Sequence, residues 1–345
     1  MLGEMGSYTH PNQIYLQIDY LDFLKKTMNI KELLRFLCEP ILINGCSTYA
    51  PDLYSGKAGY ALALFMANTY LDEEYIEQRA YDLLRESLLA QLDNISFEDG
   101  LSGIGFALLF LIRNDFIEAT FEELFDEQHQ KIIQRSKQAI KKGEDITSLL
   151  KICYYLQAIN PESKYWKESR KLLEKIISLH NKEVRSVLLS FTQQENKNSW
   201  IYVSSLLETS LEVQALCHYS NLQISEILEI FSQIYKKGRV TCSHVIGYYM
   251  NELDTTKSFQ DTVDNILVAS SYIRYYPELG NIKSHIEADK IWGEDAFIHS
   301  ICTSTREECE HLLNMRKEKG FQLIGYEKGI SRLVMYLANK KIQLL

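Results

Sequence analysis

The sequence predicts an all-α fold, a closed α/α toroid in which a double ring of inner and outer helices consists of about seven helix-pair repeats. Apolar residues recur at helical spacing, and no long stretch alternates with period two. A glycine-led apolar segment also returns at a step of about 45 residues, which indicates a repeat. The chain of 345 residues has five prolines and no linker-like stretch, so we expect one domain over residues 1–345.

Composition and charge exclude several function classes. The net charge is −9, and neither sign forms a long block, so we expect no nucleic-acid partner. The longest uncharged apolar stretch, residues 58–71, is shorter than the roughly 20 residues that cross a bilayer, so we expect no membrane partner. The N-terminus lacks the features of a signal peptide and the seven cysteines are scattered, which together predict a cytoplasmic location.

Two copies of one unit stand in the first third of the chain. The segment GKAGYAL aligns with GLSGIGF, so that Gly56 and Gly59 correspond to Gly100 and Gly103. The apolar helices that follow, expected over 57–70 and 103–113, have no polar face and must be covered on all sides, as inner helices are. The segment 73–93 is apolar on one face only and is predicted to be an outer helix. We expect the glycines where the backbone turns with positive φ or packs closely.

A third copy closes the chain in the segment YEKGISRLVMYLA, and it predicts an inner helix over 328–340. Gly329 corresponds to Gly59 and Gly103, and Tyr326, next to Gly325, takes the place of the first glycine. The separations of 44 residues from Gly59 to Gly103 and 226 residues from Gly103 to Gly329 correspond to seven repeats in all. Degenerate copies are expected near 148, 193, 238 and 283, and Ser148 does precede an apolar helix.

The segments LYSGKAGYALALFMA, DGLSGIGFALLFLI and GYEKGISRLVMYLA resemble the glycine repeats of the lanthionine synthetase C-like (LanC-like) family. The resemblance implies a toroid of seven inner and seven outer helices and a role in the maturation of lanthipeptides and related peptides. It also implies, for members with cyclase activity, a zinc site of one cysteine and an adjacent Cys-His pair. There a peptide thiolate adds to a dehydrated serine or threonine and closes a thioether ring.

This sequence departs from that zinc motif. Its nearest remnants are Cys242 with His244, and His285, before which Ser284 stands in place of a ligand cysteine. A hydroxyl is a poor zinc ligand, so we assign no metal ligand and expect no cofactor, with convergence of these side chains on zinc as the alternative. The candidate cavity residues are Lys57, Asp99, Cys242, His244, His285 and Tyr326.

Charged residues at the glycine motifs have two interpretations. Glu98 and Asp99 would suit the acid and base of a sugar-cleaving toroid, but we favour an N-cap and a partner of the helix dipole. Lys57 and Lys328 stand near inner-helix N-termini, which attract anions, and we favour solvated lysines there.

Thiols and tyrosines offer weaker candidates. Cys302 with His299, or Cys309 with His311, would suit a thiol nucleophile only if the imidazole reaches the sulfur, and we favour accidental neighbours. Adjacent tyrosines, such as those at 154–155, 248–249 and 275–276, would suit the gripping of a peptide, and we favour packing.

Three functions follow from these features. We favour a divergent LanC-like protein that binds a precursor peptide or a partner modification enzyme, without an intact zinc site and with no catalytic residue assigned. The alternatives are an active thioether-forming cyclase with relocated zinc ligands and a carbohydrate-active toroid. Metal content separates the first two, and facing carboxylates would favour the third.

Overall fold

The structure is a computed structural model. It describes residues 28–143, 146–192, 304–318 and 329–342, together with Leu206, Gln233, Ile301 and Gly325. Within these residues the chain is all-helical and contains no strand. The helices are α2 (Ile30–Asn44), the 3₁₀ helix η1 (Gly45–Ser47), α3 (Lys57–Leu71), α4 (Glu74–Leu88), α5 (Leu101–Arg113), α6 (Phe121–Lys142), α7 (Ile146–Leu150), α8 (Ile152–Ala158), α9 (Trp166–Thr192), α16 (Arg306–Glu318) and α17 (Ile330–Ile342).

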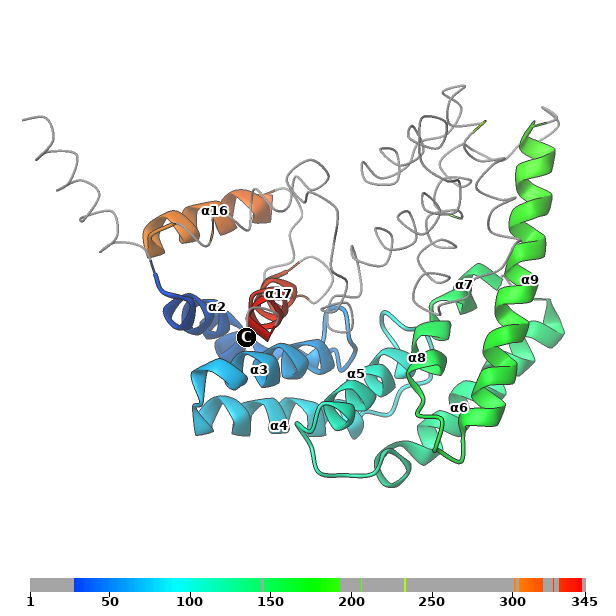
Figure 1. The fold of residues 1–345 in the computed structure, drawn as a ribbon, viewed down its shortest axis with the longest axis horizontal. Coiled ribbons are helices and arrows are strands. Elements are labelled where there is room, and N and C mark those ends of the chain that lie inside the picture. Colours follow the sequence, from blue (N-terminus) through cyan, green and yellow to red (C-terminus); the bar gives the residue numbers. More distant parts are fainter. Residues whose placement is uncertain are drawn as a thin grey trace, which may run out of the picture.

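The helices form two layers of an arc (Figure 1). Helices α3, α5 and α8 lie on its concave side, and α4, α6 and α9 lie on its convex side. Nearly every residue of α3 and α5 is buried, whereas α4 buries a single face. A helix that is apolar on all faces must be covered on all faces, whereas a helix with one apolar face must be covered on that face only. The hydrophobic pattern therefore accounts for the two layers. The helices predicted over 57–70, 73–93 and 103–113 are confirmed, with ends shifted by a few residues.

The third inner segment is interrupted. A buried helix was expected near residue 148, and α7 and α8 occupy this place with a break at Lys151. Six of the seven residues of α8 are buried, and both short helices pack against α9. The copies expected near 193, 238 and 283 lie outside the described residues.

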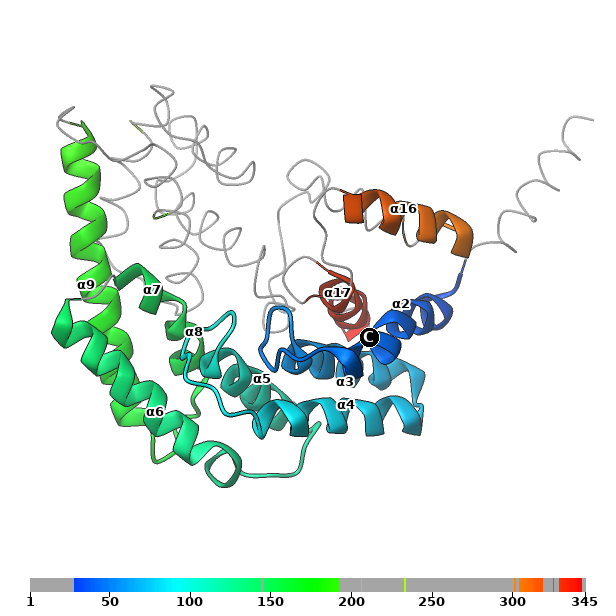
Figure 2. The same cartoon turned by 180° about the vertical axis from the view of Figure 1, so that it is seen from behind.

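The last helix of the chain packs beside the first glycine-led helix. Helix α17 contacts both α3 and α2, and the same neighbours appear from behind (Figure 2). The buried hydroxyl of Tyr70 in α3 donates a hydrogen bond of 2.8 Å to the carbonyl of Ala338 in α17. Helix α16 lies against α2, where Arg306 pairs with Glu39 at 2.9 Å. The two ends of the described chain are therefore joined directly.

No helix in the described part of the chain combines the length and the apolar character that crossing a membrane requires.

Candidate functional site

The two loops that lead into α3 and α5 have the same backbone construction. The amide of Lys57 donates to the carbonyl of Ala50, and the amide of Leu101 donates to that of Asn94, both at 3.0 Å. In each case the acceptor precedes the donor by seven residues, and the two loops are 44 residues apart. The alignment of the two glycine motifs thus corresponds to a shared three-dimensional loop.

Close packing explains the first glycine of each motif. Gly56 and Gly100 are the N-caps of α3 and α5, with φ of −122° and −137°. Of the two reasons expected for glycine, positive φ does not apply here, because extended backbone suits any residue, and close packing does. A Cβ on Gly56 would lie 2.5 Å from the carbonyl oxygen of Ala50, and one on Gly100 would lie 2.6 Å from that of Asn94. The missing side chain lets each loop fold back on the start of its helix.

The second glycines lie one turn further into the inner helices. A Cβ on Gly103 would lie 2.1 Å from the carbonyl oxygen of Phe97 and 2.8 Å from Cβ of Leu53 in the neighbouring loop. Gly103 thus marks the point where the two loops meet. Gly59, Gly325 and Gly329 are buried.

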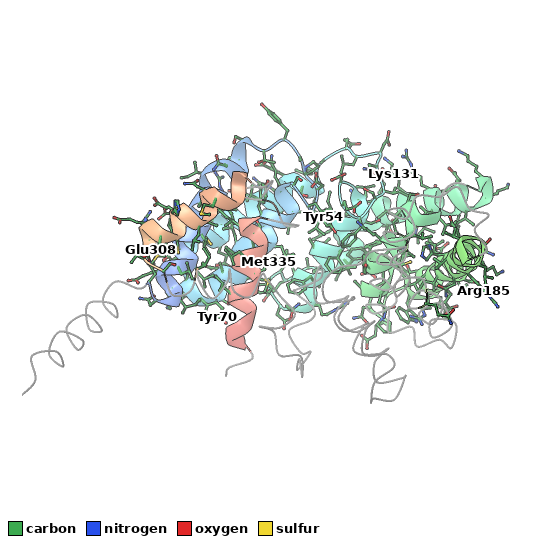
Figure 3. The ribbon with its side chains drawn as sticks, turned by 90° about the horizontal axis from the view of Figure 1, so that it is seen from above. Tyr54, Tyr70, Lys131, Arg185, Glu308 and Met335 are labelled. Carbon is green, nitrogen blue, oxygen red and sulfur yellow. The ribbon has the colours of Figure 1, made fainter. Side chains whose placement is uncertain are left out.

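Loops 48–56 and 92–100, with Lys151, form one surface that we call the loop rim. The amide of Tyr54 donates to the carbonyl of Glu98 at 3.2 Å and links the two loops. Lys151, at the break between α7 and α8, pairs with the carboxylate of Glu98, and its Nζ lies 5.8 Å from the centre of the Tyr54 ring. Figure 3 shows Tyr54 and Lys131 on one side of the molecule and Tyr70 on the other. The rim therefore stands at one end of the inner helices.

A buried carboxyl, Asp52, belongs to the rim and was missed by the sequence analysis. Its side chain is 6% exposed and accepts a hydrogen bond of 2.8 Å from the amide of Ser55. Burial raises the pKa of Asp52, and the negative charge of Asp99 raises this pKa further. Ser96, which stands 44 residues later, accepts from the amide of Asp99 in the same way, at 3.2 Å. Extending the alignment of the two motifs upstream would have found this position.

Two interpretations of the charged residues at the glycine motifs are corrected. Neither Glu98 nor Asp99 caps α5, because Gly100 is the N-cap and no side chain bonds to the capped amides. Asp99 is instead exposed. Lys57 is not a solvated lysine, because its side chain is only 14% exposed and pairs with Glu86 of the outer helix α4.

The structure describes few of the thiols and imidazoles that were singled out. Cys309 is buried and its thiol contacts the carbonyl of Ile301 at 3.4 Å, whereas His311, two residues on, is exposed. This pair is therefore not a thiol nucleophile with its base. The candidates that lie outside the described residues are Cys242, His244, Ser284, His285, His299, Cys302, Tyr326 and Lys328.

A buried histidine lies between the inner and outer layers. His129 of α6 is fully buried, and its Nδ1 lies 2.6 Å from the hydroxyl oxygen of Tyr155. Burial lowers the pKa of His129 to about 4, so the ring is neutral near pH 7. Its ring centre lies 4.1 Å from that of Tyr165. Tyr154 is also buried and packs on Phe97, which confirms packing for this tyrosine pair.

Over the residues that the structure describes, no group of three or more His, Cys, Asp or Glu side chains is arranged to hold a metal ion. The rim combines the exposed carboxylate of Asp99, the paired ammonium of Lys151 and the exposed ring of Tyr49, which suits binding through hydrogen bonds and ring contacts.

Known proteins offer no further guide to this site. No protein-family model matches the sequence, and neither a curated protein nor a solved structure matches the chain.

Proposed function

We propose that the protein is a LanC-like α/α toroid that acts in peptide modification and binds a precursor peptide or a partner modification enzyme at the loop rim, without an intact zinc site. The matched construction of loops 48–56 and 92–100 carries this proposal. Repeat proteins present their binding loops at equivalent ends of neighbouring units, as these two loops stand. The packing of α17 on α3 supports closure of the ring.

The chemistry of the rim suits an extended peptide. A peptide backbone offers amide groups, and the exposed carboxylate of Asp99 can accept hydrogen bonds from them. Tyr49 is 99% exposed in the same loop as Tyr54 and presents a rigid ring with a polar tip. Together they provide polar and apolar contacts on one rim, as extended peptides require.

A labelled peptide with one cysteine and one dehydroalanine tests this assignment by fluorescence anisotropy. We expect Asp99→Asn and Tyr49→Ser each to raise the dissociation constant at least about threefold, because the first removes the charge of the acceptor and the second removes the aromatic ring. The matched controls Glu307→Gln and Met315→Ser alter exposed side chains on α16, outside the loop rim, and should leave the dissociation constant unchanged. Equal affinities for all four variants would contradict binding at the rim.

The active cyclase is the first alternative, and metal content separates it from our proposal. The resemblance places Ser284 where a ligand cysteine is expected, so the remaining Cys and His donors do not reproduce the family site. We expect elemental analysis to find well below one zinc per chain in protein purified without added metal. Thiol addition to a dehydrated peptide should proceed at the uncatalysed rate. Stoichiometric zinc that disappears in a Cys242→Ala, His285→Ala variant would favour the cyclase.

A carbohydrate-active toroid is the second alternative, and the carboxyl pair of the rim is the observation that favours it. Asp52 has a raised pKa and Asp99 is exposed nearby, as an acid and a base in glycoside cleavage would be. Activity on a panel of nitrophenyl glycosides tests this alternative. Hydrolysis that is lost in both Asp52→Asn and Asp99→Asn would favour it, and no hydrolysis is expected from our proposal.

A further inference from the structure

The outer layer carries a basic groove between α6 and α9, which follow the first two glycine motifs in the chain. The groove has a volume of about 500 Å³ and is lined by Lys137, Ile140, Lys167, Glu168, Lys171, Leu172 and Lys175. Four lysines and one glutamate thus gather on a chain whose net charge is −9. This local excess of positive charge opposes the charge of the whole molecule.

Three of the lysines follow one face of α9. Lys167, Lys171 and Lys175 are spaced by four residues, so they lie one above another at steps of about 6 Å. All three are exposed, and no ion pair of theirs occurs among the described residues. Lys137 of α6 pairs with Glu168 and joins the two helices at the groove. The available positive charge is therefore a row of about 12 Å along the helix axis.

The floor of the groove is apolar. Leu172 is 4% exposed and Ile140 is half-buried, and they approach the groove from opposite helices. A hydrophobic floor beside a row of cations is complementary to an amphipathic helix whose acidic residues recur every fourth position. A small anion would meet only one or two of the lysines and would leave the floor uncovered.

We propose that the groove between α6 and α9 is a docking site for an acidic amphipathic helix of a partner protein. Its carboxylates pair with Lys167, Lys171 and Lys175, and an apolar stripe on the same helix covers Ile140 and Leu172. Helices α6 and α9, which line the groove, lie on the convex side of the arc (Figure 1). The inference therefore does not rest on the function proposed for the loop rim.

A designed peptide probes this site on the full chain. The peptide is about 16 residues long, carries glutamate at every fourth position with leucines on the adjoining stripe, and bears a fluorescent label. A scrambled peptide has the same composition, but its glutamates and leucines do not form separate faces of a helix. We expect the patterned peptide to bind, the scrambled peptide to bind at least about tenfold more weakly, and the affinity to fall as salt is raised.

The second experiment reverses the charge of two lysines in the groove. The variant Lys167→Glu, Lys171→Glu should weaken binding of the patterned peptide by about tenfold or more. The control Lys31→Glu, Arg85→Glu makes the same change of charge at exposed positions on α2 and α4 and should change the affinity by less than about twofold. Circular dichroism shows whether both variants keep their helix content.

Several outcomes would overturn the proposal. Absence of binding, equal binding of the scrambled peptide, or equal losses in the groove and control variants would each remove the docking site. A different result would assign the groove to a phosphate-bearing ligand instead. In that case ATP or a polyadenylate RNA binds and the patterned peptide does not, and this binding is lost in the Lys167→Glu, Lys171→Glu variant.

Discussion

At the scale of single residues, the missing side chains of the glycine motifs decide how closely the loops approach the inner helices. Gly56 and Gly100 meet carbonyl oxygens of their own loops, and Gly103 meets both its own loop and the neighbouring one. A Cβ closer than about 3 Å to backbone atoms forces the main chain to move, which is costly because interiors are densely packed. The motif glycines therefore support the fold whatever the rim binds.

We predict that Gly103→Ala lowers the free energy of unfolding by about 2 kcal/mol or more, because the new Cβ would overlap the carbonyl of Phe97. Urea denaturation measures the change. Gly45→Ala is the matched control, since its Cβ would sit in ordinary contact, 3.4 Å from Leu83, in helical backbone with φ of −57°. Equal midpoints for Gly103→Ala and Gly45→Ala would show that close packing at Gly103 is unimportant.

His129 predicts a pH dependence of stability. Its pKa is about 4 in the folded protein, mainly through burial, against 6.5 ordinarily. The unfolded chain thus binds the proton more readily than the folded protein. The stability that the neutral imidazole allows is therefore fully present above pH 6.5 and is lost as the pH falls towards 4. Between pH 7.5 and pH 5 we expect His129 to account for a loss of about 2 kcal/mol.

The variant His129→Gln isolates this effect, because it keeps a polar group beside Tyr155 and does not titrate. Denaturation at both pH values should show a smaller loss in the variant than in the native chain. If the two proteins lose the same stability on acidification, the folded pKa of His129 is close to its ordinary value.

At the scale of elements, burial separates the inner from the outer helices. The only charged residues of α3 and α5 are Lys57, the first residue of α3, and Arg113, the last residue of α5. Helices α4 and α6 instead have an apolar face and a charged face. The third inner segment breaks at Lys151, whose ammonium pairs with Glu98. A charged residue in an otherwise apolar segment thus lies where the helix ends and reaches the loop rim.

Helix α17 should stabilise α3 from the far end of the sequence. Leu337 is 3% exposed, and we predict that Leu337→Ala lowers the free energy of unfolding by about 2 to 5 kcal/mol. Amide hydrogen exchange should also become faster in α3, because the two helices pack together. Met315→Ala, at a side chain 45% exposed on α16, should stay within about 0.5 kcal/mol. Unchanged exchange in α3 would contradict this packing.

At the scale of the whole molecule, the meeting of α17 with α3 and α2 joins the two ends of the described chain. An arc with inner helices on its concave side and outer helices on its convex side is the arrangement that a repeat of about 45 residues produces (Figure 1). Closure of this arc into a ring of seven units is our proposal for the complete fold.

Small-angle X-ray scattering tests closure. A compact chain of 345 residues is expected to have a radius of gyration of about 20 Å. A closed toroid should give this value, because its ends pack together and its core is continuous. A radius of gyration well above about 25 Å would indicate an open superhelix.

The sequence by itself determined the helical class, the places of α3, α4, α5 and α17, and the equivalence of the first two glycine motifs. These are local properties, since hydrophobic periodicity and a missing Cβ act within one helix or one turn. Only the tertiary structure decided which groups meet: Tyr70 with a carbonyl 268 residues away, Lys57 with Glu86, and His129 with Tyr155. The burial of Asp52 and the basic groove of α6 and α9 likewise depend on which helices pack together, and this packing brings together residues that local sequence patterns do not link.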